Sequence, residues 1–500
     1  MSDVVLVYPR TGMDLKKVSR GIPLPLLAVA SEVTGDFKVR IIDQRVHDNW
    51  ESELIRELKT KPLCVGITAI TGHQIFHGLR ASRIVHENSQ GIPVVWGGMH
   101  VTILPEQSLR HPQVDMVIRG DGEWAFRDLV RALADKKPLE TVGGLSWKKN
   151  GEIIRNSDGP PVVLDETKPY PFELVDIENY VSPGEYRFAG IKRLLPFMGS
   201  RGCPFKCTFC AEPALTKVYR MMKPELVYER AFQMVKTFNL DMVIFHDEEF
   251  FANAQWGTRV AELINNKFKW WTQTRANDLL RIDLKKMEQC GLFVTTPGLE
   301  SGSDRILRFI KKGETIKEYR EVNRRLVQTG IHVVYNFMMG FPTETREEVY
   351  ETIDLAMELL KENPKAFLHS FALYSPLPGT ELLAQSKQWG YDPSEDLESW
   401  IETSRHNFVT PWLKDNMEMY LNLAYTSRFV GPRARMMGQG FWWFPPFIFD
   451  VYSWIIQQNW KQRRFKNTWD VKILQFLHKT FVNPVLTRRK LADDSSCTKI

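Results

Sequence analysis

The sequence predicts an α/β fold in which an N-terminal doubly wound parallel sheet is followed by a partial (βα)6 barrel and a mainly helical C-terminal cap. Three observations support this prediction. The chain has 500 residues, enough for about three domains. Short β-branched runs alternate with helical patterns up to about residue 390. Beyond that point the alternation stops, and the last 110 residues are rich in aromatic and basic side chains.

Residues 1–140 are expected to form the first domain. Five short apolar runs, each followed by a helical pattern, predict strands at 4–8, 38–43, 64–68, 93–96 and 115–118. Strands that alternate with helices form a parallel sheet with helices on both faces. Residues 141–185 are polar and rich in proline, which predicts a linker, and Lys148-Lys149-Asn150-Gly151 indicates a hairpin turn within it.

Residues 186–390 are expected to form the second domain. Its six strands are predicted near 194–198, 242–245, 269–272, 293–296, 333–338 and 367–373. Six βα units are too few to close an eight-stranded barrel, so we expect an open, partial barrel with its functional residues at the C-terminal ends of the strands. Residues 391–500 are expected to form the cap.

Composition and charge exclude several classes of protein. With 43% apolar and 25% charged residues, the chain is typical of a globular enzyme and not of disordered, collagen-like or coiled-coil proteins. The N-terminus has no basic region or cleavage site, so we expect no signal peptide and a cytoplasmic location. The most apolar stretch, residues 441–456, is shorter than the roughly 20 residues that span a bilayer, and it contains Asp450. No transmembrane helix is expected.

Three of the six cysteines follow the first barrel strand in Gly202-Cys203-Pro204-Phe205-Lys206-Cys207-Thr208-Phe209-Cys210. Three thiolates can each bind one iron of a cubane cluster and leave the fourth iron open to a non-protein ligand. A structural zinc site needs a fourth ligand, but no fourth Cys is near and the closest His, His246, lies on the next strand. We therefore predict that Cys203, Cys207 and Cys210 bind an iron–sulfur cluster.

With Phe209 directly before the last Cys, this spacing resembles the signature of radical S-adenosylmethionine (SAM) enzymes. The resemblance implies a [4Fe–4S] cluster whose open iron is chelated by SAM, and it implies SAM contacts at the ends of the following strands. These are Phe209, Asp247, Glu248, Glu249, Arg275, Glu300 and Asn336. Each also has a simpler interpretation: the acidic residues could solvate a loop, Arg275 could form a surface ion pair, and Glu300 could cap a helix.

The first domain resembles the Rossmann-like, cobalamin-binding module that precedes the radical domain in one subgroup of that superfamily. Thr68 ends the third strand, and Gly97-Gly98 follows the fourth, where small residues leave room for a cofactor tail. A generic nucleotide site could use the same arrangement. The loop after the first strand, residues 9–22, contains no His. The resemblance therefore implies cobalt without a His ligand, with Arg10 and Thr11 near its lower face.

The resemblance implies a cobalamin-dependent radical SAM enzyme. An electron delivered to the cluster would cleave SAM, the 5′-deoxyadenosyl radical would abstract hydrogen from an unactivated carbon, and methylcobalamin would donate a methyl group. We predict C-methylation. Residues 406–433 loosely resemble the anaerobic Mg-protoporphyrin monomethyl ester cyclase, which leaves open an oxidation, rearrangement or ring formation without methyl transfer. A non-catalytic carrier is the third alternative, and it would need neither Arg275 nor Glu300.

The expected partners are a small-molecule substrate and an electron donor such as flavodoxin or ferredoxin. Residues 441–500 hold five of the 15 Trp and ten Lys or Arg against four Asp or Glu. Indole rings beside basic side chains suit a membrane surface, which would imply an apolar or lipid-like substrate, and an apolar stripe is expected at Ile473, Leu474, Leu477 and Phe481. The alternative is a cap that packs its aromatic rings on the barrel. No motif for nucleic acid accompanies the charge.

Overall fold

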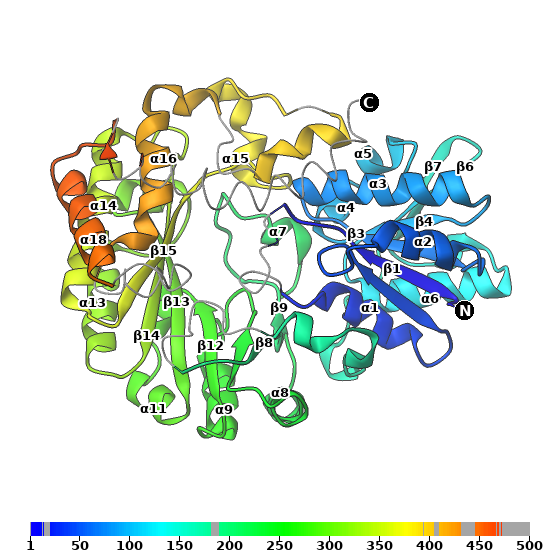
Figure 1. Cartoon of the computed structure of the whole chain (residues 1–500), viewed down its shortest axis with the longest axis horizontal. Coiled ribbons are helices and arrows are strands. Elements are labelled where there is room, and N and C mark those ends of the chain that lie inside the picture. Colours follow the sequence, from blue (N-terminus) through cyan, green and yellow to red (C-terminus); the bar gives the residue numbers. More distant parts are fainter. Residues whose placement is uncertain are drawn as a thin grey trace.

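The computed structural model describes residues 2–12, 14, 21–181, 190–393, 395–404, 410–431, 446–466, 468, 469 and 472. Two α/β lobes lie side by side, α15 and the segments next to it run across one end of both, and α18 lies on the outer side of the barrel lobe (Figure 1). The predicted fold class is confirmed: a doubly wound sheet, an open six-stranded barrel and a helical C-terminal part.

The first lobe contains a seven-stranded sheet in the order β2-β1-β3-β4-β5-β6-β7. Its strands are β1 (Val4–Tyr8), β2 (Val39–Asp43), β3 (Cys64–Thr68), β4 (Val94–Gly97), β5 (Met116–Ile118), β6 (Leu145–Lys149) and β7 (Glu152–Arg155). The first five strands are parallel, as predicted, and β6 and β7 pair antiparallel at the edge. Asn150 and Gly151, at φ of 53° and 86°, form the tight turn between β6 and β7. The predicted hairpin thus extends this sheet.

Helices cover both faces of the first sheet. These are α1 (Leu24–Val33), α2 (Trp50–Leu58), α3 (His73–Asn88), α4 (Met99–Ile103), α5 (Pro105–Arg110) and α6 (Gly122–Asp135). Val4 and Leu6 pack in the same core as α1 and α6, whereas Val5 and Val7 pack in the core with α2 and α3. This alternation follows from the two-residue period of a strand. The core beneath α1 and α6 continues into the barrel lobe.

The second lobe is an all-parallel sheet in the order β15-β14-β13-β12-β11-β8. Its strands are β8 (Leu194–Phe197), β11 (Met242–Phe245), β12 (Lys269–Thr274), β13 (Leu292–Glu300), β14 (His332–Met339) and β15 (Ala366–Leu373). The helices are α8 (Pro224–Phe238), α9 (Ala254–Ile264), α10 (Ala276–Leu279), α11 (Leu284–Gln289), α12 (Asp304–Phe309), α13 (Ile316–Val327) and α14 (Arg346–Glu362). Thr315 and Thr345 begin α13 and α14 with capping boxes. Strand β13 runs four residues past its predicted end.

The C-terminal part connects the two lobes. It contains α15 (Glu381–Ala384), α16 (Met417–Thr426), α18 (Pro446–Lys461) and short 3-10 turns such as Leu397–Trp400. Leu397 and Trp400 join the core of the first lobe, while α16 and α18 pack beside β15. Within the described residues, no helix is long and apolar enough to cross a bilayer. Residues 405–409 and 432–445, and the stripe expected at Ile473 to Phe481, lie outside the described residues.

Candidate cofactor site at the lobe junction

The three clustered cysteines lie in the loop that follows β8 and the short strand β9 (Ser200–Arg201), which pairs with β10 (Arg220–Met221). Gly202 begins the loop at φ of 86°, and a Cβ there would meet Thr216 Cγ2 at 2.7 Å, so the turn requires glycine. Backbone bonds fix the loop at Thr208, whose N–H donates to Ile310 O (2.9 Å) and whose carbonyl accepts from Leu382 N–H (3.0 Å).

The thiols of Cys203, Cys207 and Cys210 are free and half-buried. Burial raises the pKa of Cys203 to about 12 and that of Cys210 to about 11, so both are protonated unless a metal displaces the proton. Within the described residues, no three His, Cys, Asp or Glu side chains surround one point closely enough to hold a single ion. A cubane cluster does not need such convergence, because each thiolate binds a different iron.

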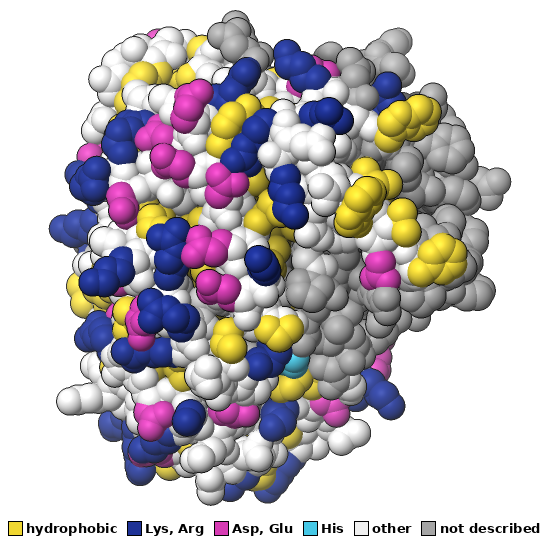
Figure 2. Space-filling model, turned by 90° about the vertical axis from the view of Figure 1, so that its left-hand side faces the viewer, with side chains coloured by type: hydrophobic (Ala, Val, Ile, Leu, Met, Phe, Trp, Pro, Cys, Tyr) yellow, Lys and Arg dark blue, Asp and Glu magenta, His cyan; other side chains and the backbone are white. Residues whose placement is uncertain are grey.

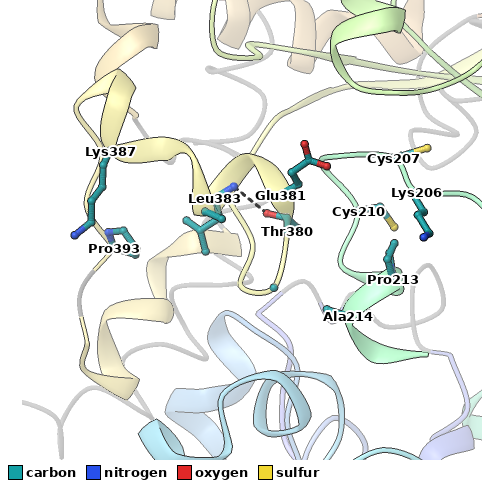
Figure 3. A pocket seen from close by; sticks show the side chains of 12 residues that line it. Lys206, Cys207, Cys210, Pro213, Ala214, Thr380, Glu381, Leu383, Lys387 and Pro393 are labelled. Carbon is teal, nitrogen blue, oxygen red and sulfur yellow. Dashed lines mark hydrogen bonds between the residues drawn. The ribbon is translucent and has the colours of Figure 1, made fainter. Parts of the chain in front are cut away.

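Cys207 and Cys210 open onto a cavity of about 640 Å³ between the cysteine loop, α7 (Glu212–Leu215) and α15 (Figure 3). Figure 3 shows the two cysteines and Lys206 on one side of this cavity, with Thr380, Glu381 and Leu383 on the other. The donor set is three free thiols on one loop, two of which line an open space. These residues fit an iron–sulfur cluster.

Two of the three acidic residues after β11 point into the protein. Asp247 is fully buried and accepts hydrogen bonds from Ser200 Oγ (2.5 Å) and Gly199 N–H (3.2 Å). Glu249 is also buried and accepts from Thr274 Oγ1 (2.6 Å). Burial raises the pKa of Asp247 to about 6 and that of Glu249 to about 8. Loop solvation is therefore the wrong interpretation for these two residues, whereas Glu248 is exposed.

Arg275, at the end of β12, is buried and contacts the cysteine loop. Its guanidinium lies 3.9 Å from the Phe205 ring centroid, and its Nη1 donates to Cys207 Sγ at 3.6 Å. Its Nη2 donates to the carbonyl oxygen of Lys312. With only 5% of its surface exposed, Arg275 does not form the surface ion pair considered as an alternative.

Glu300 lies on a bulge at the end of β13, in the left-handed region at φ of 63°. It does not cap α12, because Ser303 performs that role. Instead, Glu300 Oε1 lies 3.1 Å from Lys312 Nζ, and Lys312 also lies 3.6 Å from Glu314 Oε2. Sequence analysis missed Lys312 and Glu314. The available signal was the polar run Lys311-Lys312-Gly313-Glu314 between two helical patterns.

Asn336 and Phe209 complete the predicted SAM residues. Asn336 lies within β14, as predicted, and its Oδ1 is buried without a hydrogen-bond partner among the described residues. A buried oxygen without a partner can accept a hydrogen bond from a bound ligand. Phe209 packs against Phe341, with ring centroids 5.8 Å apart, so its ring supports the cysteine loop from the core side.

The predicted cobalamin residues lie at the C-terminal edge of the first sheet. Gly98 has φ of 101°, and a Cβ there would lie 2.8 Å from Ala69 O, whereas a Cβ at Gly97 would meet nothing within 4 Å. Position 98 must therefore be glycine, because any side chain there would clash with the loop that follows Thr68. The space beside Gly97 is open and could hold a ligand. Arg10 donates through Nε to Gln44 O (2.9 Å), and Thr11 Oγ1 donates to Asp14 Oδ1 (2.7 Å).

Ion pairs tie the cysteine loop to the first lobe. Arg201, two residues before Cys203, pairs with Asp121 Oδ1 (3.1 Å) and with Glu123, and Arg220 pairs with Asp121 Oδ2 (2.5 Å). Helix α4, which follows Gly98, packs on α7, which follows Cys210. The structure therefore brings the two sets of predicted cofactor residues to one junction between the lobes.

Two family models match this chain: the Radical SAM superfamily over residues 198–356 and the B12 binding domain over residues 15–130. An uncharacterised methyltransferase from Pyrococcus horikoshii is 30% identical over 86% of this chain and 93% of that protein. The anaerobic magnesium-protoporphyrin IX monomethyl ester cyclase of Cereibacter sphaeroides is 28% identical over 73% of this chain and 58% of its own length. The structure of radical S-adenosylmethionine methyltransferase TsrM from Kitasatospora setae, with cobalamin and a [4Fe-4S] cluster bound, superposes with a TM-score of 0.63 at 18% identity, covering 78% of this chain and 75% of that one.

Proposed function

We propose that this chain, which belongs to the cobalamin-binding radical SAM enzymes, replaces hydrogen on an unactivated carbon of a small-molecule substrate with a methyl group. As a member of this family it uses a [4Fe–4S] cluster, SAM and cobalamin, together with an electron donor. Methylation is supported by its methyltransferase relatives. When bound, these cofactors supply the electron, the hydrogen-abstracting radical and the methyl group.

We assign the cluster to Cys203, Cys207 and Cys210, the only cysteines of the chain on one short loop. SAM is assigned to the residues around that loop, and cobalamin to the C-terminal edge of the first sheet. The SAM set is Phe209, Asp247, Glu248, Glu249, Arg275, Glu300 and Asn336, and the cobalamin set is Arg10, Thr11, Thr68, Gly97 and Gly98. In this assignment, residues 1–140 form the cobalamin domain, 141–185 form a linker whose hairpin extends the first sheet, 186–390 form the radical SAM barrel, and 391–500 form the cap.

The observation that carries the proposal is the attachment of the cysteine loop to the cobalamin lobe through Arg201. This arginine has a side-chain exposure of only 19%, and its two carboxylate partners are Asp121, which precedes α6, and Glu123 in the first turn of α6. Buried paired charges strongly resist separation, because each would be left without a partner. The chain thereby keeps the two cofactor sites at a constant separation, which methyl transfer between them requires.

We further propose that an apolar substrate reaches the enzyme from a membrane surface on which the C-terminal part rests. Helix α18 buries Ile456 and Trp460 against the barrel but exposes Phe447, Val451 and Trp454 on its other side, with more than half of each side chain accessible. On the face of the molecule drawn in Figure 2, apolar side chains gather toward one edge. Lys461, Arg463, Arg464 and Lys466 follow directly, a composition that suits anionic lipid.

The test uses anaerobic turnover of the reconstituted full chain with methyl-deuterated SAM, a flavodoxin or ferredoxin as electron donor and a small-molecule extract of the source cells. Methylation predicts a product that carries the deuterated methyl group and S-adenosylhomocysteine alongside 5′-deoxyadenosine. Ring formation or oxidation, as in the cyclase relative, predicts 5′-deoxyadenosine without labelled product. That second outcome would replace methylation as the proposed reaction.

A further inference from the structure

We propose that Arg275 sets the reduction potential of the cluster by donating a charged hydrogen bond to Cys207. The role is that of a positioning residue, and it rests on the proposed ligation of the cluster by the three loop cysteines. This role is separate from the SAM contact assigned to Arg275, because it depends only on the contacts of the guanidinium with the cysteine loop and with the segment after α12.

Three contacts hold the guanidinium in one place. Nη1 donates to Cys207 Sγ at 3.6 Å, Nη2 donates to the backbone carbonyl of Lys312, and Cζ lies over the Phe205 ring at 3.9 Å from its centroid. Phe205 belongs to the same loop as Cys207. Arg275 therefore contacts the cysteine loop at both Cys207 and Phe205. A rotation of its side chain would break the hydrogen bond to Cys207 and uncover the Phe205 ring.

The surroundings preserve the positive charge of Arg275. Glu314 Oε2 lies 3.9 Å from Arg275 Nη2. Lys312 forms ion pairs with this carboxylate and with that of Glu300. With 6% of the arginine side chain exposed, water screens its charge only weakly.

The other loop cysteines receive neutral donors. The backbone N–H of Glu212 donates to Cys210 Sγ at 3.4 Å, and a backbone hydrogen bond from Phe205 acts on Cys203. Within the described residues, Cys207 is thus the loop cysteine that accepts a hydrogen bond from a charged side chain. Reduction adds one negative charge to the cluster, so a cation hydrogen-bonded to a ligand sulfur stabilises the reduced form and raises the potential.

The experiment compares anaerobically reconstituted full-length wild type with Arg275→Gln, Arg275→Lys and the matched control Arg281→Gln. Arg281 pairs with Asp278 in the same segment, with 56% of its side chain exposed. Iron content is measured first, and the cluster potential is then titrated by electron paramagnetic resonance without SAM, so that no SAM carboxylate can contribute. We expect a more negative potential in Arg275→Gln, a smaller shift of the same sign in Arg275→Lys and no shift in Arg281→Gln.

An unchanged or more positive potential in Arg275→Gln at wild-type iron content overturns the inference. If Arg275→Gln does not retain its cluster, the potential of Arg275→Lys is the test. A cluster potential in Arg275→Lys that equals or exceeds that of wild type then overturns the inference. Failure of the proposed cluster assignment is a separate result, because it would appear as full iron content in Cys207→Ala.

Discussion

Trp400 donates its indole N–H to the side-chain oxygen of Gln107 (Nε1–Oε1 2.9 Å), although 293 positions separate the two residues in sequence. Two positions before Trp400, Glu398 Oε1 lies 2.9 Å from Nε2 of His111, a residue of the first lobe. The ring of Trp400 is 4% exposed and packs in the core of the cobalamin lobe, with its centroid 6.1 Å from that of His100. The C-terminal part is therefore bound to the first lobe by a buried anchor.

Trp400→Ala should destabilise the protein by about 3–5 kcal/mol, because it leaves a large cavity and an unpaired Gln107. Urea unfolding measures the change. Trp454→Ala is the matched control: Trp454 is 61% exposed, so little change in the free energy of unfolding is expected. Equal effects of the two substitutions would show that Trp400 does not anchor the segment.

Replacing Cys203, Cys207 or Cys210 with Ala should each abolish bound iron, because a cubane held by three thiolates loses one of its protein ligands. Cys290→Ala is the control, since Cys290 is a buried free thiol between α11 and β13. Iron analysis and absorbance after anaerobic reconstitution report the outcome. Loss of iron in Cys290→Ala with retention in Cys210→Ala would contradict the assignment.

Glu344→Gln should make the protein increasingly more stable than wild type as the pH rises from 5 to 8. Glu344 Oε2 accepts from Gly340 N–H (2.5 Å), but Oε1 is buried without a partner among the described residues, and burial raises the pKa to about 8. The folded state therefore holds a proton that the unfolded state loses above its ordinary pKa. Wild-type stability falls over this window by at most about 1.4 kcal/mol per pH unit from this group, and glutamine removes the effect.

Glu348→Gln is the control for that experiment. Glu348 is ionised and paired with Arg305 at 2.6 Å, and its pKa is lowered to about 2. Its stabilising contribution is lost only as the pH falls toward that value, so the substitution should destabilise the protein equally at pH 5 and pH 8. Urea unfolding at several pH values measures both variants. A pH-independent effect of Glu344→Gln would show that Glu344 is ionised when folded.

Serine substitutions of Phe447, Val451 and Trp454 together should abolish binding to anionic vesicles. Each nearby Lys or Arg contributes about 1 kcal/mol at an anionic surface, so wild-type binding should also weaken with salt. Co-sedimentation with anionic and uncharged vesicles measures this. Val163→Ser with Val218→Ser is the control, because both valines are about half exposed away from α18. Undiminished binding by the triple variant would remove the membrane proposal.

Several features of the fold and the site follow from the sequence alone. The period of apolar residues located all five parallel strands of the first sheet and all six barrel strands, because a buried parallel strand is a continuous β-branched run. The cysteine spacing indicated cluster chemistry without any tertiary information, since the three thiols come from one loop. The Gly97-Gly98 pair likewise marked an edge of the sheet where one position, Gly98, needs glycine.

What the sequence alone could not determine is which distant polar groups meet. Glu300 and Lys312 are 12 positions apart, Arg201 and Asp121 are 80 apart, and Trp400 and Gln107 are 293 apart. Hydrophobic periodicity specifies which face of each helix or strand is buried. It does not specify which distant charged side chain a given residue will pair with when the two lobes pack together. The tertiary structure alone decided that Arg275 meets Cys207 and that Asp247 faces inward, because packing brings the ends of parallel strands together and removes water from the groups there.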